Sequence, residues 1–187
     1  QALRTPQFWL LWVVLCFNVT AGIGVIGVAK TMINEIFGSL VIVTTAFAGT
    51  YVLMISVFNI VGRFFWASTS DYIGRKNTYH CFFILGTILY LSIPYFAGEG
   101  SMLALAGFYL ATMAIFTMYG GGFATIPAYL ADMFGTMHVG GIHGRLLTAW
   151  STAGVLGPFA ITYLRNVSKN NAISDLVANI DPAAFVQ

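Results

Sequence analysis

Long apolar runs separated by short polar links dominate the chain. About 20 consecutive apolar residues cross the hydrocarbon core of a bilayer as an α-helix. A membrane β-barrel would instead alternate in hydrophobicity over about 10 residues in each strand. The runs here are continuous and longer, so the pattern predicts an all-α membrane protein, a bundle of five transmembrane helices. The predicted spans are residues 8–29, with a possible extension to Phe37, and residues 40–61, 77–96, 102–130 and 142–164.

Polar positions mark the links between these runs and a polar tail. The links are short and lie at residues 38–39, 97–101 and 135–141. After Arg165 the sequence becomes polar. Residues 1–165 are therefore predicted to form the bundle, and residues 166–187 an extracytoplasmic loop or tail. The tail has no sixth spanning run; a short amphipathic helix over residues 173–180 and a loop before a further helix both fit it.

Composition indicates that lipid rather than water is the main solvent. The chain of 187 residues is 58% hydrophobic and 7% charged, whereas soluble domains carry about 25% charged residues. A formal net charge of +2 gives no reason to expect nucleic acid as a partner. Cys16 and Cys81 lie in apolar runs and are expected to be free thiols. The histidines share no metal-ligand spacing and no nucleophile–base pair stands out, so no metal, cofactor or enzyme activity is predicted.

Basic residues predict the orientation, because they concentrate in cytoplasmic loops. One face of the predicted bundle carries Arg4, Arg63, Arg75, Lys76 and Arg145. The other face carries Arg165 and Lys169, with Lys30 near the outer end of the first run. The chain is therefore predicted to be a multi-pass protein of the cell membrane with a cytoplasmic N-terminus.

Charge is concentrated in one stretch, GRFFWASTSDYIGRK, which is predicted to be a turn over residues 62–76. Its charged residues are Arg63, Asp71, Arg75 and Lys76. Asp71 and Arg75 lie four positions apart, and Gly62 and Gly74 permit close approach or tight turning. Ion pairs that break and re-form would suit a gate. A solvated loop whose charges only fix the topology fits the same residues.

The order of residues in this stretch resembles the signature loop of the major facilitator superfamily. That signature reads Gly-x-x-x-Asp-(Arg/Lys)-x-Gly-Arg-(Arg/Lys), and it joins the second and third helices of each six-helix half. The matching residues here are Asp71, Gly74, Arg75 and Lys76. Ala67 stands at the first glycine and Tyr72 at the first basic position. Residues 17–27, 119–135 and 144–158 resemble the oxalate/formate antiporter-like branch of the same superfamily.

The resemblance, which covers nearly all of residues 4–165, implies a fold and a mechanism. The five runs would be helices seven to eleven of a twelve-helix transporter, in a fragment whose N-terminal half is missing. The implied activity is secondary active transport by alternating access. In the family, the second arginine of the signature often pairs with an acid at the end of the fourth helix of its half. Asp132 lies at that place, so we expect an Arg75–Asp132 contact within a gate that also contains Asp71.

Polar groups within the apolar runs are the candidates for substrate binding. They are Asn18, Lys30, Tyr119 and Trp150. A charge deep in the bilayer costs about 2.5–3.5 kcal/mol even on lenient scales, so Lys30 could face a cavity and attract an anion. Snorkelling to the outer interface, beside Asn34 or Glu35, is the alternative. Asn18 and Tyr119 could line a central cavity or could only hold helices together.

Glycine and proline positions predict irregular backbone in two of the helices. The candidates for flexing are Gly120, Gly121, Gly122 and Pro127 in the fourth run, and Gly154, Gly157 and Pro158 in the fifth. Proline removes an internal hydrogen bond and kinks a helix, and discontinuous helices line the cavities of transporters. Ordinary close packing of helices through small residues is the alternative.

The resemblance to the oxalate/formate branch implies a small organic anion as substrate. Oxalate carriers of this branch place basic residues in the middle of their eighth and eleventh helices. The corresponding runs here have none in the middle, because Arg63 and Arg145 are predicted to lie at the cytoplasmic ends. A monocarboxylate is therefore predicted. The competing hypothesis is a non-transporting membrane scaffold or receptor-like half-bundle, although a static anchor has no need of a gate.

Overall fold

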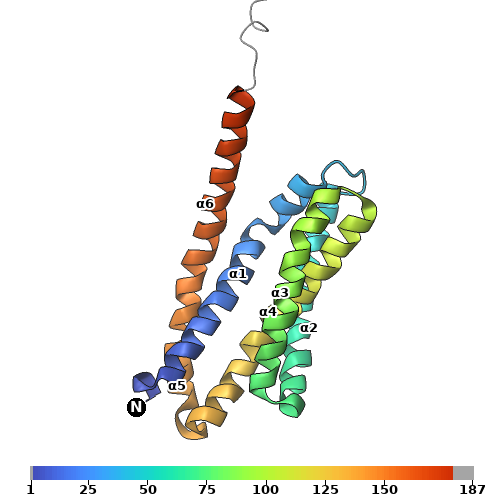
Figure 1. Cartoon of the computed structure of the whole chain (residues 1–187). Coiled ribbons are helices and arrows are strands. Elements are labelled where there is room, and N and C mark those ends of the chain that lie inside the picture. Colours follow the sequence, from blue (N-terminus) through green and yellow to red (C-terminus); the bar gives the residue numbers. More distant parts are fainter. Residues whose placement is uncertain (1, 179–187) are drawn as a thin grey trace, which may run out of the picture.

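Helices account for almost all of residues 2–178, the part of the chain that the computed structural model describes (Figure 1). Two short 3-10 helices, η1 (Ala2–Arg4) and η2 (Thr136–His138), accompany six α-helices. These are α1 (Pro6–Phe37), α2 (Thr45–Ile73), α3 (Arg75–Glu99), α4 (Met102–Phe134), α5 (Val139–Leu146) and α6 (Thr148–Ala178). Within residues 2–178, α1 to α4 are long and apolar enough to cross a membrane. The described part of the chain is thus all-helical, with four helices that could span a membrane.

Local chemistry sets the beginnings of the long helices. Pro6 is the first residue of α1, where its missing N–H would have no helical partner in any case. The Thr44 hydroxyl accepts a hydrogen bond from the Phe47 backbone N–H at 3.2 Å and caps α2. The Ser101 hydroxyl caps α4 in the same way, accepting from the Ala104 N–H at 3.1 Å. Each cap satisfies a donor that the first turn leaves free.

The second run begins and ends later than the hydrophobic pattern predicts. Its helix, α2, starts at Thr45 and continues to Ile73. The predicted turn over residues 62–76 is therefore wrong, because most of it is helical. Gly74 alone separates α2 from α3, with a φ of 86° that side-chain-bearing residues rarely adopt. The polar and charged residues near the end of α2 had been interpreted as a turn between two helices.

The fifth run is divided and extended relative to its prediction. Leu147 separates the short α5 from α6. Helix α6 then passes through Arg165 without a break and ends at Ala178, so the described part of the polar tail is helical. It is less apolar than α1 to α4 and is not among the four candidate spans in the described region. Residues 179–187, which include the end of the predicted amphipathic helix, lie outside the described residues.

Two helix pairs organise the bundle. Helix α2 packs most extensively against α4, and α1 packs against α6 along one side of the molecule (Figure 1). In the most apolar part of α4, 50% of the residues are buried, compared with 6% in α3. Helix α4 is therefore the centre of the bundle, and α3 is an outer helix that packs against α4.

Glycines allow the backbones to touch within each pair. A Cβ atom at Gly62 of α2 would overlap the backbone of Thr117 on α4, and one at Gly120 would overlap the Asn59 carbonyl. In the other pair, a Cβ atom at Gly157 of α6 would lie 2.7 Å from the carbonyl oxygen of Thr20 on α1. Small residues at helix crossings permit this close approach in membranes.

Candidate functional site

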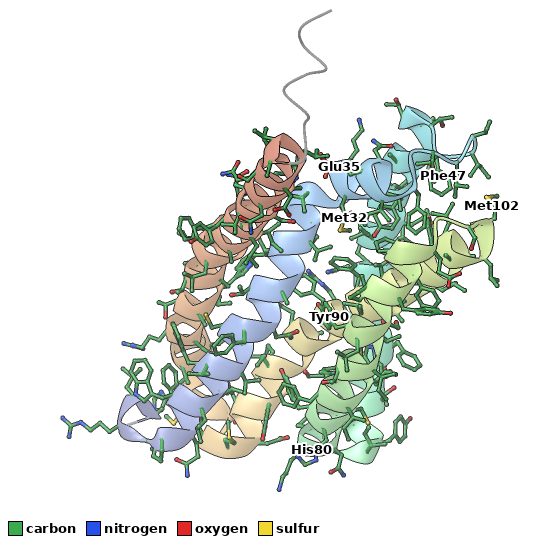
Figure 2. All side chains as sticks on the ribbon, turned by 45° about the horizontal axis from the view of Figure 1, so that its top comes forward. Met32, Glu35, Phe47, His80, Tyr90 and Met102 are labelled. Carbon is green, nitrogen blue, oxygen red and sulfur yellow. The ribbon has the colours of Figure 1, made fainter. Side chains whose placement is uncertain are left out.

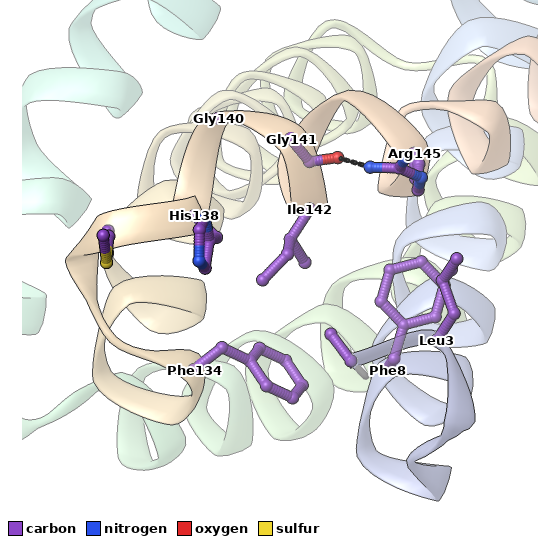
Figure 3. A pocket seen from close by; sticks show the side chains of 10 residues that line it. Leu3, Phe8, Phe134, His138, Gly140, Gly141, Ile142 and Arg145 are labelled. Carbon is purple, nitrogen blue, oxygen red and sulfur yellow. Dashed lines mark hydrogen bonds between the residues drawn. The ribbon is translucent and has the colours of Figure 1, made fainter.

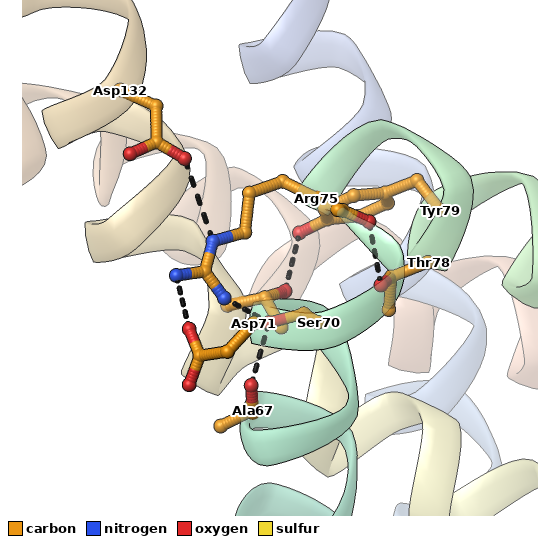
Figure 4. A network of polar contacts seen from close by, with 9 residues as sticks. Ala67, Ser70, Asp71, Arg75, Thr78, Tyr79 and Asp132 are labelled. Carbon is orange, nitrogen blue, oxygen red and sulfur yellow. Dashed lines mark hydrogen bonds and ion pairs between the residues drawn. The ribbon is translucent and has the colours of Figure 1, made fainter.

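One end of the bundle carries an ion-pair network that we call the Arg75 cluster (Figure 4). Arg75, the first residue of α3, lies between Asp71 on α2 and Asp132 on α4. Its Nη2 atom is 2.5 Å from Asp71 Oδ1, and its Nε atom is 3.5 Å from Asp132 Oδ2. The Arg75 side chain is 18% exposed, whereas the two carboxylates are 63% and 61% exposed. The expected Arg75–Asp132 contact is present, and the cluster joins three helices.

The buried hydroxyl of Ser70 also holds the Arg75 guanidinium group. Ser70 is 1% exposed. Its Oγ atom accepts a hydrogen bond from Arg75 Nη1 and donates to the Ala67 carbonyl at 2.7 Å. Arg75 is therefore held by a neutral group from α2 as well as by two carboxylates. Lys76, the last basic residue of the signature, is exposed beside this network.

The sequence predicted Arg63 at the end of its helix, but the structure places it well inside α2. Because α2 continues to Ile73, Arg63 is ten residues inside the helix, or about 15 Å from its end at 1.5 Å per residue. The helix is 29 residues long, so Arg63 is about 6 Å from its middle. The prediction that Arg63 lies at the helix end, and that this helix has no basic residue near its middle, was therefore wrong.

The side chain of Arg63 is exposed but oriented by neighbours on two helices. Its Nε atom donates to Asn59 Oδ1 at 3.2 Å, one helical turn away. Its Cζ atom lies 5.9 Å from the centre of the Phe123 ring on α4, in a cation–π contact. The Phe123 ring meets Trp150 of α6 edge to face, with centroids 5.2 Å apart. We call these four residues, on α2, α4 and α6, the Arg63 face.

The structure brings together some of the predicted substrate-binding residues and separates others. Trp150 belongs to the Arg63 face. The Tyr119 ring is buried against Gly22 of α1. Asn18 instead lines a cavity of about 380 Å³ between α1 and α3. Lys30 is exposed, twelve residues further along α1, which is about 18 Å from Asn18.

The glycines predicted to flex occupy two different environments. A Cβ atom at Gly121 would overlap the side chain of Trp66, and one at Gly122 would lie 2.5 Å from Asn18 Nδ2. These positions are closely packed, as are Gly120 and Gly157. Gly154 has open space around it. Pro127 and Pro158 both lie inside helices that continue on either side of them.

A second charge cluster, which the sequence did not predict, lies at the opposite end of the bundle. Glu35 of α1 is contacted by two cations of α6, Arg165 and Lys169. Arg165 reaches both carboxylate oxygens, through Nη2 and through Nε at 3.3 Å, and Lys169 Nζ lies 3.4 Å from Oε1. Figure 2 shows Glu35 at the end opposite His80, five residues after Arg75. We call these three residues the Glu35 cluster. Glu35, which the sequence offered as a neighbour for a snorkelling Lys30, thus pairs with Arg165 and Lys169.

Comparison with known proteins finds two relatives of this chain. The oxalate:formate antiporter of Oxalobacter formigenes is 31% identical over 160 residues, which cover 84% of this chain and 35% of the relative. The uncharacterised MFS-type transporter YhjX of Escherichia coli K12 is 28% identical over 135 residues, which cover 72% of this chain and 31% of the relative. The chain thus spans about a third of the length of the curated relatives it matches. No family model and no solved structure matches it.

Proposed function

Because the chain belongs to the major facilitator superfamily, as a transporter sequence of the oxalate/formate antiporter type and not an enzyme, we propose that the natural protein moves a small organic anion. Transport would be secondary active and would proceed by alternating access. Helices α1 to α4, together with the divided pair α5 and α6, would then be helices seven to eleven of a twelve-helix protein, and the partner half would precede them. The substrate would bind between the two halves near the membrane midplane.

The observation that carries this proposal is the position of Arg63. A guanidinium group near the middle of an apolar helix is costly unless it faces a cavity, a partner or an ion. Asn59 and the Phe123 ring hold one edge and one face of the group. The two terminal nitrogens are then available to a carboxylate, which arginine binds with two parallel hydrogen bonds.

The charge of the Arg63 face favours a monocarboxylate. Its four residues supply one cation, which contacts the Phe123 ring, and Phe123 in turn contacts Trp150. A single guanidinium group neutralises one carboxylate, while the rings of Phe123 and Trp150 would contact a small apolar remainder. A dicarboxylate such as oxalate would need a second cation, from another helix or from the other half. Asn18 packs against Gly122, the neighbour of Phe123, and Lys30 is exposed about 18 Å further along α1.

The Arg75 cluster supports a gating role at the same time. Its two carboxylates are more than half exposed, so their ion pairs can exchange for pairs with a facing half at little cost. We propose that this end is cytoplasmic, with the N-terminus on the same side. Gly154, which has open space, and Pro127 and Pro158, which interrupt helical hydrogen bonding, would permit the accompanying bending of α4 and α6.

Counterflow in proteoliposomes tests the proposed function. The natural full-length protein would be reconstituted into vesicles loaded with unlabelled formate, and uptake of labelled formate or labelled oxalate would be followed. We expect formate uptake well above that of protein-free vesicles and a weaker response to oxalate. Uptake of neither, or of any small organic anion offered in the same way, by correctly folded protein would support the scaffold hypothesis instead.

A further inference from the structure

A large cavity opens at the end of the bundle that carries the Arg75 cluster (Figure 3). Its volume is about 630 Å³, and it lies between η1 and the start of α1, the end of α4, and α5. The side chains of Phe8, Phe134 and Ile142 border it in Figure 3. It contains none of the Arg63 face, so it is separate from the proposed substrate site.

The lining of this cavity combines apolar side chains with basic groups. Arg145 and His138 lie on its border, and no acidic residue contributes to the described lining. The Arg145 Nη1 atom donates to the Gly141 carbonyl at 2.9 Å, which fixes the guanidinium beside the cavity and leaves its other N–H groups free. Asp132, an acid near the end of α4, is already paired with Arg75. The cavity therefore has a positive border without a compensating carboxylate.

The depth of the cavity indicates what could occupy it. It lies where two candidate membrane spans have their ends, since α1 begins at Pro6 and α4 ends at Phe134. If α1 and α4 span a bilayer, their ends lie in the headgroup region, because helices of 32 and 33 residues are longer than the hydrocarbon core of about 30 Å. A ligand suited to the site would carry a negative group toward Arg145 and an apolar part toward Phe8 and Ile142. Basic pockets between helix ends bind anionic lipid headgroups in this manner.

We propose that this cavity is a binding site for an anionic phospholipid. The lipid phosphate would accept hydrogen bonds from Arg145 and His138, and the glycerol and the first acyl carbons would contact the apolar lining. Such a lipid would connect α1, α4 and α5 at one end of the bundle. The proposal does not depend on which anion the protein transports.

Binding of phosphatidylglycerol to the natural full-length protein, measured by native mass spectrometry with phosphatidylcholine as the competing lipid, tests this site. Arg145→Gln removes the main charge. Gly140→Leu places a side chain at a lining position where an added Cβ would meet no atom within 4 Å, so it would narrow the cavity without a backbone clash. The matched control is Arg4→Gln, which removes an exposed charge at the same end but outside the described lining.

We expect preferential binding of phosphatidylglycerol by the unmodified protein. Arg145→Gln should weaken it about tenfold, because a charged hydrogen bond to the phosphate is lost. Gly140→Leu should weaken it at least as much, and Arg4→Gln less than twofold. Equal affinity in all three variants and the unmodified protein would overturn the proposal. Displacement of the lipid by millimolar inorganic phosphate would also contradict it, because the cavity would then be a site for free anions.

Discussion

The two helix pairs of the bundle, α2–α4 and α1–α6, share a type of side-chain hydrogen bond and a type of backbone contact, but the charge clusters beside them have opposite signs at their centres. In each pair a tryptophan indole donates to a threonine hydroxyl: Trp66 to Thr117 between α2 and α4, and Trp12 to Thr148 between α1 and α6. Each pair also has a glycine at a backbone contact. At one end of the bundle Arg75, the first residue of α3, lies between an acid of α2 and an acid of α4, whereas at the opposite end Glu35 of α1 lies between two cations of α6.

The difference between the pairs lies in burial. The central cation of the Arg75 cluster is 18% exposed, but the central acid of the Glu35 cluster is 46% exposed. Helix α4 is the most buried of the four candidate spans, whereas α6 is not among those spans in the described region. Contacts of the α2–α4 pair should therefore contribute more to stability, and the α1–α6 pair should tolerate more change.

The largest expected effect comes from the backbone contact of the α2–α4 pair. Gly62→Ala should lower the free energy of unfolding by about 3 kcal/mol, because the new methyl group would overlap the Thr117 backbone, which cannot move aside easily. Gly49→Ala in the same helix is the control, since an added Cβ there meets no atom within 4 Å. Unfolding of the purified protein in mixed micelles measures both. Equal stability of the two variants would contradict the expectation that a closely packed glycine tolerates a side chain less well than a glycine with open space around it.

An intermediate effect is expected at the Arg75 cluster. Arg75→Gln leaves Asp71 and Asp132 without their shared cation and should cost about 2 kcal/mol of stability, because charged hydrogen bonds to a mostly buried group are lost. Formate counterflow should fall as well, if the cluster is a gate. Lys76→Gln, at the exposed neighbouring position, should change neither quantity. A loss of the same size in Lys76→Gln would mean that only the total charge at this end matters.

The smallest effect is expected at the Glu35 cluster. Glu35→Gln should cost less than about 1 kcal/mol, since all three side chains are at least 37% exposed and water screens their attraction. The loss should also shrink in high salt. Melting curves at low and high ionic strength test this prediction. A cost equal to that of Arg75→Gln would show that exposure does not distinguish the two clusters.

Hydrophobic periodicity was sufficient to predict most of the fold. The apolar runs predicted five spanning helices, of which four are candidate spans in the described region and the fifth, α6, is not. The signature residues gave the Arg75–Asp132 contact, because a family pattern specifies partners that are far apart in sequence. The end of α2 could not be located in the same way. Polar residues continue a helix as readily as they end it, and only Gly74 interrupts the backbone there.

Two features of the candidate site could not be predicted from the sequence. Because α2 continues to Ile73, Arg63 lies ten residues inside the helix and not at its end, which no residue type in the sequence had indicated. The Glu35–Arg165 pair joins residues 130 positions apart, and no motif relates them. Hydropathy likewise gave no sign that α6 would continue beyond Arg165, because the residues that follow are polar and fit a loop as well as a helix.

We propose that Arg63 binds the transported anion. Formate counterflow by Arg63→Gln, compared with Arg63→Lys and with the unmodified full-length protein, measures this role. We expect Arg63→Gln to lose roughly tenfold to a hundredfold in uptake, the effect of one charged hydrogen-bond donor worth about 1.5–3 kcal/mol, and Arg63→Lys to retain part of it through its charge. Uptake and apparent affinity that are unchanged in a folded Arg63→Gln protein would contradict the assignment.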